Sequence, residues 1–108
     1  MKIKEAFIFV ESGVDSVKDR ATIETSNFDF LIQGVKSIEE GVSAAKRLVE
    51  EGVSSVDLCC AFGYAGVKAV SDAVGDKVPV GVVTFQLWEA PKLTKSLEAW
   101  KRHLARRS

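Results

Sequence analysis

The 108-residue chain is 46% hydrophobic and 28% charged, and its formal net charge is zero. These proportions are typical of a soluble globular protein and argue against a disordered chain or a coiled coil. No apolar run approaches the roughly 20 residues that a transmembrane helix needs. We therefore expect a single domain over residues 1–108, located in the cytoplasm and without a membrane partner.

Charge is distributed unevenly along the chain. Residues 1–91 carry 9 basic and 14 acidic side chains, a net charge of −5, whereas residues 92–108 carry 6 basic and 1 acidic, a net charge of +5. Positive charge confined to a terminal segment does not indicate a nucleic-acid partner. Two cysteines and one histidine predict neither a disulfide framework nor a metal site, and no motif indicates a cofactor.

The N-terminal third predicts three strands. The first covers residues 4–10 and has apolar side chains on both faces, which is typical of a strand covered on both sides. We interpret this stretch as a strand rather than a signal peptide, because Glu5 interrupts it and no cleavage site follows. Asp15 is placed to cap one helical turn. Two β-rich runs, residues 22–24 and 28–35, then flank a turn.

The strongest helix signal begins at Ser37, which forms a capping box with Glu40. Gly52 is the left-handed residue expected after the end of a helix, so we predict a helix near residues 38–51. Lys46 and Arg47 are expected on its outer side. The apolar stripe on the other side consists of Ile38, Val42, Ala45 and Val49.

Strand and helix patterns alternate in the rest of the chain. A strand is predicted over residues 55–60, a helix over 63–74, a buried apolar strand over 78–85 and a final helix over about 91–106. Short strand–helix–strand connections are typical of right-handed crossovers in a parallel sheet. The predicted fold class is therefore α/β, a single layered sandwich in which helices flank a mostly parallel sheet of four or five strands.

One long segment is also familiar as a whole. The run GVKSIEEGVSAAKRLVEEGVSSVDLCCAFGYAG, followed by VPVGVV, resembles a family of short prokaryotic α/β proteins catalogued as a domain of unknown function. The first strand and IETSNFDF fit the same family, so the resemblance covers about residues 4–85. This family has no established activity, substrate or catalytic residues, so the resemblance implies a fold and no function.

The turn after the strand at residues 55–60 is the leading candidate for a binding site. Open α/β sheets bind ligands at the carboxyl ends of their strands, and amides at a helix N-terminus favour phosphate or carboxylate. In the structural alternative, which is the more frequent case, Gly63 makes a tight turn and Gly66 lets the helix sit on the sheet. The candidate ligand-binding residues are Cys60, Ala61, Phe62, Gly63, Tyr64 and Gly66.

Cys59 and Asp57 are the candidate catalytic residues at the same edge. A thiolate near a helix N-terminus is activated, and a carboxylate beside it can act as an acid or base. In the structural alternative both cysteines are small buried hydrophobes, and Asp57 pairs with a basic residue such as Arg20. The single histidine, His103, belongs to the distant final helix, so Cys59 has no obvious base.

The final helix carries an apolar stripe of Leu93, Leu97, Trp100 and Leu104 and a basic opposite face. It packs either over its own sheet or against a neighbouring subunit, where its charge complements the acidic remainder of the chain. We expect a homo-oligomer, most simply a dimer, with Trp100 near the contact.

Three functions follow from these features. The first expectation is binding of a small anionic metabolite at the turn of residues 60–66. The alternatives are a small enzyme that uses Cys59 or Asp57 at the same edge, and a structural or regulatory oligomer without a ligand.

Overall fold

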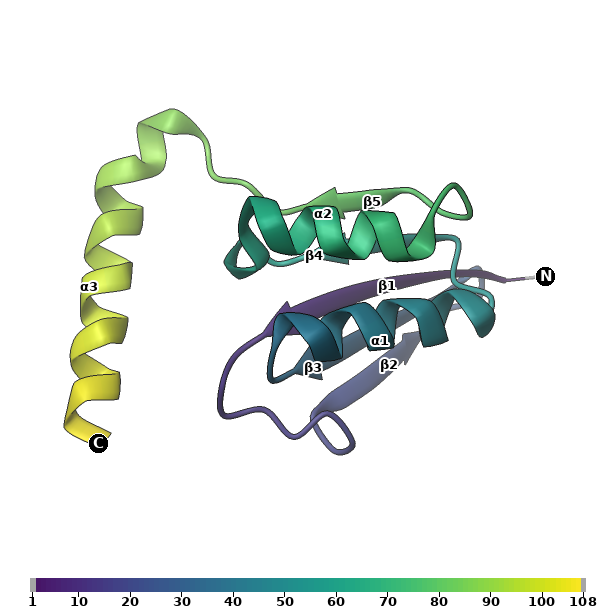
Figure 1. Cartoon of the computed structure of the whole chain (residues 1–108), viewed down its shortest axis with the longest axis horizontal. Coiled ribbons are helices and arrows are strands. Elements are labelled where there is room, and N and C mark those ends of the chain that lie inside the picture. The colour runs from purple at the N-terminus through teal and green to yellow at the C-terminus, as the bar shows by residue number, and fades with distance from the viewer. Residues whose placement is uncertain (1, 108) are drawn as a thin grey trace.

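The strand and helix signals of the sequence form regular elements in the computed structural model, which describes residues 2–107. Runs of β-branched and aromatic residues form the strands, whose side chains suit a pleated surface. The strands are β1 (Ile3–Val10), β2 (Arg20–Glu24), β3 (Phe28–Val35), β4 (Ser55–Leu58) and β5 (Val80–Val82). The helices are α1 (Ile38–Glu50), α2 (Gly63–Val74) and α3 (Ala90–Arg107), with short 3-10 turns at Cys60–Phe62 and Leu87–Glu89 (Figure 1).

The five strands form one sheet in the order β2-β3-β1-β4-β5. Strand β1 pairs in parallel with both β3 and β4, and β4 pairs in parallel with β5. Strand β2 is antiparallel to β3 at one edge. These pairings confirm the predicted α/β class with a mostly parallel sheet, including the parallel alignment of the two strands that α2 connects.

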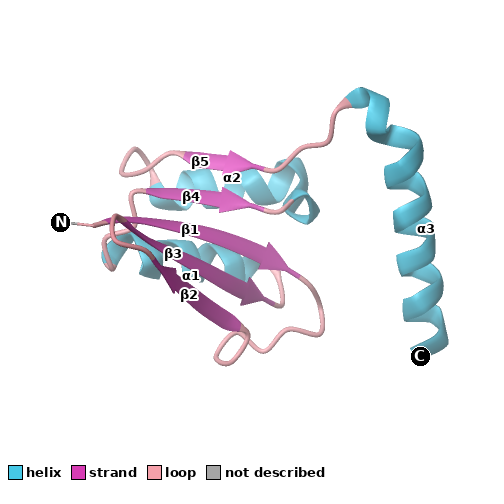
Figure 2. Cartoon of the chain, turned by 180° about the vertical axis from the view of Figure 1, so that it is seen from behind, coloured by secondary structure: helices cyan, strands magenta, loops and turns pink. Residues whose placement is uncertain are grey.

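Helices α1 and α2 both lie on the same face of this sheet, as the two opposite views show (Figures 1 and 2). Helix α1 connects β3 to β4, and α2 connects β4 to β5, so both connections step across the sheet in the same direction. Right-handed crossovers that step in one direction place their helices on one face. Among the described elements, no helix covers the opposite face, which we call the open face.

The core lies between the helix-bearing face of the sheet and the two helices. Glycines allow α1 and α2 to approach closely around Phe62: a Cβ added to Gly41 would lie 2.7 Å from the Phe62 ring, and one added to Gly66 would lie 2.9 Å from Ile38 Cδ1. The largest fully buried side chains are Ile8, Val35, Leu48, Val56, Leu58 and Val70.

Helix α1 begins and ends as its sequence predicts. Ser37 Oγ accepts a hydrogen bond of 3.2 Å from the Glu40 amide, and Glu40 Oε1 accepts one of 2.8 Å from the Lys36 amide. Gly52 follows the helix with a φ of 100°, a conformation that side chains rarely adopt. The Ser37 cap and the glycine stop are confirmed, whereas the Glu40 carboxylate reaches back one residue further than a capping box predicts, to the Lys36 amide.

The expectation that the first strand is covered on both sides is wrong for this chain. Ala6 and Ile8 of β1 are buried beneath the helices, whereas Phe7 and Phe9, which point to the open face, are only half-buried. The apolar pattern therefore indicates that this face needs a cover, and the described part of the chain places no helix there.

The predicted buried strand over residues 78–85 is also shorter and more exposed than expected. Only Val80–Val82 forms a strand, although the Val83 amide also donates to the Leu58 carbonyl of β4, and Val82 and Phe85 are exposed. The apolar run lies at the edge of the sheet and then leaves it, so its residues lose the neighbours that a central strand would have.

Helix α3 stands apart from the sheet and from the other two helices (Figures 1 and 2). None of its described residues is buried, and Leu97, Trp100 and Leu104 are all exposed. Of the two expectations for this helix, packing over its own sheet is not observed.

The close approach of α1 and α2 predicts the effect of a Gly41→Ala substitution. The added methyl would lie 2.7 Å from a buried ring, and overpacking of this kind costs about 1–3 kcal/mol. Better helix propensity offsets at most about 1 kcal/mol of this. We expect urea unfolding to report a net loss of stability, with Ser43→Ala, an exposed position in the same helix, as the control that loses none. A Gly41→Ala protein as stable as the parent would contradict this packing.

Candidate functional site

The glycine-containing turn lies at the carboxyl end of β4, where the sequence predicts it. Cys60–Phe62 forms a 3-10 turn, and α2 begins directly at Gly63, whose φ is 66° and ψ −179°. This combination is essentially restricted to glycine. A Cβ added to Gly63 would contact nothing within 4 Å, so the backbone conformation requires glycine there.

The six candidate ligand-binding residues divide into two groups. Phe62 and Gly66 are buried against α1, whereas Cys60, Ala61, Gly63 and Tyr64 are exposed. The Tyr64 side chain is 99% exposed. Three hollows on the described surface, of about 480, 340 and 510 Å³, are lined by none of residues 60–66. Ligand binding at this turn stays a prediction.

The conformation of Gly63 leads to a test of its structural role. We expect Gly63→Ala to destabilise the protein by about 1–3 kcal/mol, the usual cost of a strained backbone conformation. Urea unfolding measures this loss directly. Gly13→Ala is the matched control, because Gly13 has no positive φ and an added Cβ would meet only the flexible Glu11 carboxylate. Equal stability of the two variants would show that Gly63 is not needed for its conformation.

The two candidate catalytic residues lie near each other in the chain, but the described residues provide no base for the thiol. Cys59 is half-buried, and its Sγ accepts a hydrogen bond of 3.5 Å from the Val10 amide. His103 lies on α3, where its ring stacks on Trp100 with 5.4 Å between centroids. A catalytic role for Cys59 therefore stays a prediction that still needs a base.

Asp57 points to the open face, where it lies beside Gly81 of β5: a Cβ on Gly81 would lie 2.6 Å from Asp57 Oδ1. Among residues 2–107 its carboxylate has neither a hydrogen bond nor an ion pair. Arg20 belongs to β2, and β3 and β1 separate this strand from β4. The pairing of Asp57 with Arg20 suggested by the sequence is therefore wrong, because the sheet order keeps the two strands apart.

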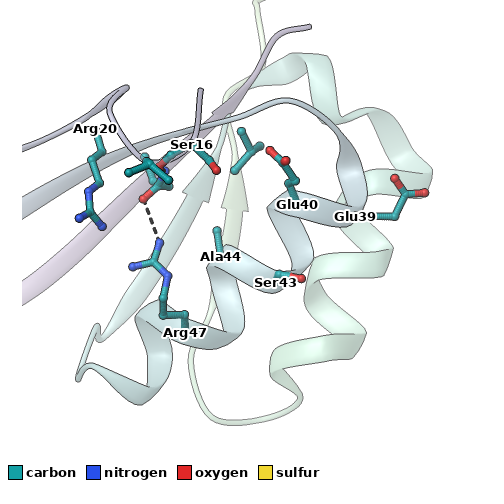
Figure 3. A pocket seen from close by; sticks show the side chains of 10 residues that line it. Ser16, Arg20, Glu39, Glu40, Ser43, Ala44 and Arg47 are labelled. Atoms are coloured by element: carbon teal, nitrogen blue, oxygen red, sulfur yellow. Dashed lines mark hydrogen bonds between the residues drawn. The ribbon is translucent and has the colours of Figure 1, made fainter. Parts of the chain in front are cut away.

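A hollow that the sequence does not indicate lies beside α1. It measures about 480 Å³, within the size range of small-ligand sites. The residues that line it come from the loop after β1, from β2 and β3, and from α1: Ser16, Val17, Arg20, Gln33, Val35, Glu39, Glu40, Ser43, Ala44 and Arg47 (Figure 3). A neighbouring hollow of about 340 Å³ shares Arg20, Gln33 and Arg47.

Gln33 holds one side of this hollow together. Its side chain is only 3% exposed, and its Nε2 donates to the carbonyl oxygens of Ser16, at 2.9 Å, and of Gly34, at 2.7 Å. Its Oε1 accepts a hydrogen bond of 2.9 Å from Arg47 Nη2, drawn dashed in Figure 3. A buried amide with all these partners fixes the loop and the guanidinium relative to β3.

The loop itself is ordered by Asp15. Its Oδ1 accepts hydrogen bonds from the amides of Val17, at 2.9 Å, and Lys18, at 3.4 Å. These bonds, that of Val17 first, lower the pKa of the Asp15 carboxyl from its ordinary 3.8. Because the folded-state pKa is lowered, the carboxylate helps to order the loop above pH about 3.8 and this contribution is lost as the pH falls.

Two guanidinium groups line this hollow, and only one of them has partners. Arg47 pairs with Glu51 at 3.4 Å, a long and partly exposed contact that contributes little. The Arg20 guanidinium has no ion pair or hydrogen bond among the residues that the structure describes. In the view of Figure 3, Arg20 and Arg47 lie to the left of the hollow and Glu39 to its right. The hollow therefore has a cationic side with one unpaired guanidinium.

The sequence contained one signal for this site. Gln33 interrupts the apolar strand FLIQGV, and a polar residue within a buried strand needs hydrogen-bond partners. Helical periodicity placed Arg47 on the outer side of α1, but its long side chain reaches back to Gln33. Periodicity locates a Cα on a helix and does not report where a flexible side chain ends.

Within residues 2–107 there is no group of three or more potential metal-ligating side chains. None of the described helices is long and apolar enough to cross a membrane.

Comparison with known proteins identifies a family. The model of a family of unknown function, DUF6506, matches residues 3–98. This confirms the resemblance seen in the sequence and extends it beyond residue 85 into the first half of α3. Neither the curated proteins nor the solved structures contain a match.

Proposed function

The chain belongs to the DUF6506 family, whose function is unknown, and we propose from its own geometry that it binds a small anionic metabolite between Arg20 and Arg47. The observation that carries this proposal is the unpaired Arg20 guanidinium beside a second, pre-oriented one. Guanidinium groups recognise carboxylate and phosphate through two parallel hydrogen bonds. The proposed ligand therefore carries at least one such group.

The support for an anion rather than a cation comes from the partners of the charged lining residues. The Glu40 carboxylate already accepts the Lys36 amide at 2.8 Å, and Glu39 is exposed to solvent. Arg47 is held by the buried Gln33 amide, so little of its freedom remains to be lost on binding. An anion would complete the hydrogen bonds of Arg20 and replace the long Arg47–Glu51 contact.

The proposal is for binding and not for a reaction. The other polar groups that line the hollow are the hydroxyls of Ser16 and Ser43, which suit hydrogen bonds to oxygen atoms of a ligand. The sequence predicts the same class of ligand at residues 60–66. The two locations are therefore distinguished by which substitutions weaken binding.

Thermal shift measurements with inorganic phosphate, succinate and citrate, at constant ionic strength and with glycerol as the uncharged comparison, test the proposal. A ligand that binds the folded state raises its melting temperature in a concentration-dependent way. We expect this for at least one of the anions. We also expect Arg20→Gln to weaken binding by about tenfold or more, because a charge-assisted hydrogen bond contributes about 1.5–3 kcal/mol.

Two further variants serve as controls. Lys46→Gln removes the same charge from the exposed side of α1 and is expected to leave binding unchanged. Gly63→Ala reports on the turn at residues 60–66. Anion stabilisation that persists in Arg20→Gln, or an absence of stabilisation by all three anions, would contradict the proposal.

A further inference from the structure

The open face of the sheet is largely apolar although no described helix covers it. Successive residues of a strand point to opposite faces, and the pairing register assigns alternate residues of β1, β2 and β3 to the open face. Those with large apolar side chains are Ile3, Phe7, Phe9, Ile23, Phe28, Phe30 and Ile32, all of them half-buried or exposed. The loop after β1 covers the carboxyl ends of β1 and β3, where Val14 and the Phe9 ring lie close to Gly34.

An exposed face of this kind is unusual for a parallel sheet. Parallel sheets occur almost only where both faces are covered, and four of the five strands here are parallel to one another. The half-buried Phe7 of β1 and Phe30 of β3 are diagonal neighbours on adjacent strands of this apolar area. The strands therefore carry apolar side chains on both faces of the sheet, but the described helices cover only one of these faces.

Helix α3 also exposes an apolar surface. Its apolar stripe is exposed at Leu97, Trp100 and Leu104, and none of its residues is buried. The accessible surface of the chain is 7577 Å², whereas a compact monomer of this mass exposes about 5,900 Å². If association removed this excess of about 1,700 Å² from each of two chains, it would bury about 3,400 Å², in the range of obligate homodimers.

Charge makes the two surfaces complementary. The charged residues assigned to the open face by the pairing register are Glu5 and Asp57, both acidic. Helix α3 is strongly basic, and Lys92 and Lys101 flank its apolar stripe. An acidic apolar surface and a basic apolar helix attract each other at long range and match when in contact.

We propose that α3 of one chain docks on the open face of a second copy, and that the exchange is reciprocal, so that two chains form a closed homodimer. Each chain contributes one α3 and one open face, so a dimer with two-fold symmetry uses both helices and both faces. No helix or face is then left to bind a third chain. The 18-residue α3 is about 27 Å long. The eight-residue strands β1 and β3 span about 26 Å, so the helix matches the length of the face.

A complementation experiment distinguishes this exchange from other pairings of the same two surfaces, α3 and the open face. A helix variant, Leu97→Asp with Trp100→Asp, removes the apolar stripe. A face variant, Ile23→Lys with Phe30→Lys, places charge on two residues that are side by side on the open face. The mass of each protein is measured by size-exclusion chromatography with light scattering, and far-UV circular dichroism confirms that it is folded.

We expect the parent chain to have twice its 11.7 kDa mass and each variant alone to be monomeric. Loss of a central aromatic contact weakens such an interface by about 30-fold or more. An equimolar mixture of the two variants is expected to form a heterodimer, because the helix variant keeps an intact face and the face variant keeps an intact helix. Only a contact between the helix of one chain and the face of another restores association in this way.

Matched controls carry a similar change on the opposite side of each element. Ala99→Asp adds a charge to α3 away from the stripe, and Thr22→Lys adds one to β2 on the helix-bearing side of the sheet. Both are expected to remain dimeric. If the face variant is unfolded, Ile23→Lys alone replaces it, because Ile23 is 57% exposed and we expect the monomer to stay folded when it is replaced.

Several outcomes overturn the proposal. A monomeric parent chain would mean that α3 covers its own sheet or remains free. A helix variant that still dimerises would indicate face-to-face pairing, and a face variant that still dimerises would indicate helix-to-helix pairing. A mixture that stays monomeric, with both variants folded, would also contradict the exchange.

Discussion

The direction in which the chain steps across its sheet determines most of this structure. From β3 the chain passes over β1 to β4 and then to β5, and both steps go toward the same edge. Because crossovers between parallel strands are right-handed, α1 and α2 must lie on one face. They share that face at close range, which Gly41 and Gly66 permit by leaving room for the Phe62 ring between the helices. The same constraint leaves the opposite face without a helix.

The connection from β1 to β3 steps in the other direction and contains no helix. Instead, a loop and the antiparallel strand β2 form the edge of the sheet. The loop is fastened by the buried Gln33, which binds the Ser16 carbonyl on one side and Arg47 on the other. A polar hollow with two arginines therefore forms where an irregular loop meets α1. It lies beside the helix-bearing side of the sheet, so a partner on the open face would leave it accessible.

Local signals in the sequence located the regular elements well. The capping box at Ser37 and the left-handed Gly52 identified the ends of α1, and Gly63 identified the start of α2, because each depends on backbone chemistry within a few residues. Burial was predicted less well. The apolar run of residues 78–85 predicts a buried strand, but only Val80–Val82 forms one, and it lies at the edge of the sheet. The apolar pattern of a strand indicates which of its faces must be buried, but it does not indicate which segment buries them.

The candidate site also depends partly on local sequence signals and partly on the tertiary structure. The sequence by itself determined the α/β class, the capped helices, the glycine turn and the amphipathic character of α3, since each is written in the spacing of neighbouring residues. Only the tertiary structure decided that Arg20, Gln33 and Arg47 meet, because they come from three elements whose proximity depends on strand order. It also decided that Asp57 is separated from Arg20 and that α3 leaves its own sheet uncovered. Long-range pairing joins residues far apart in the chain, and periodicity within one element carries no information about that pairing.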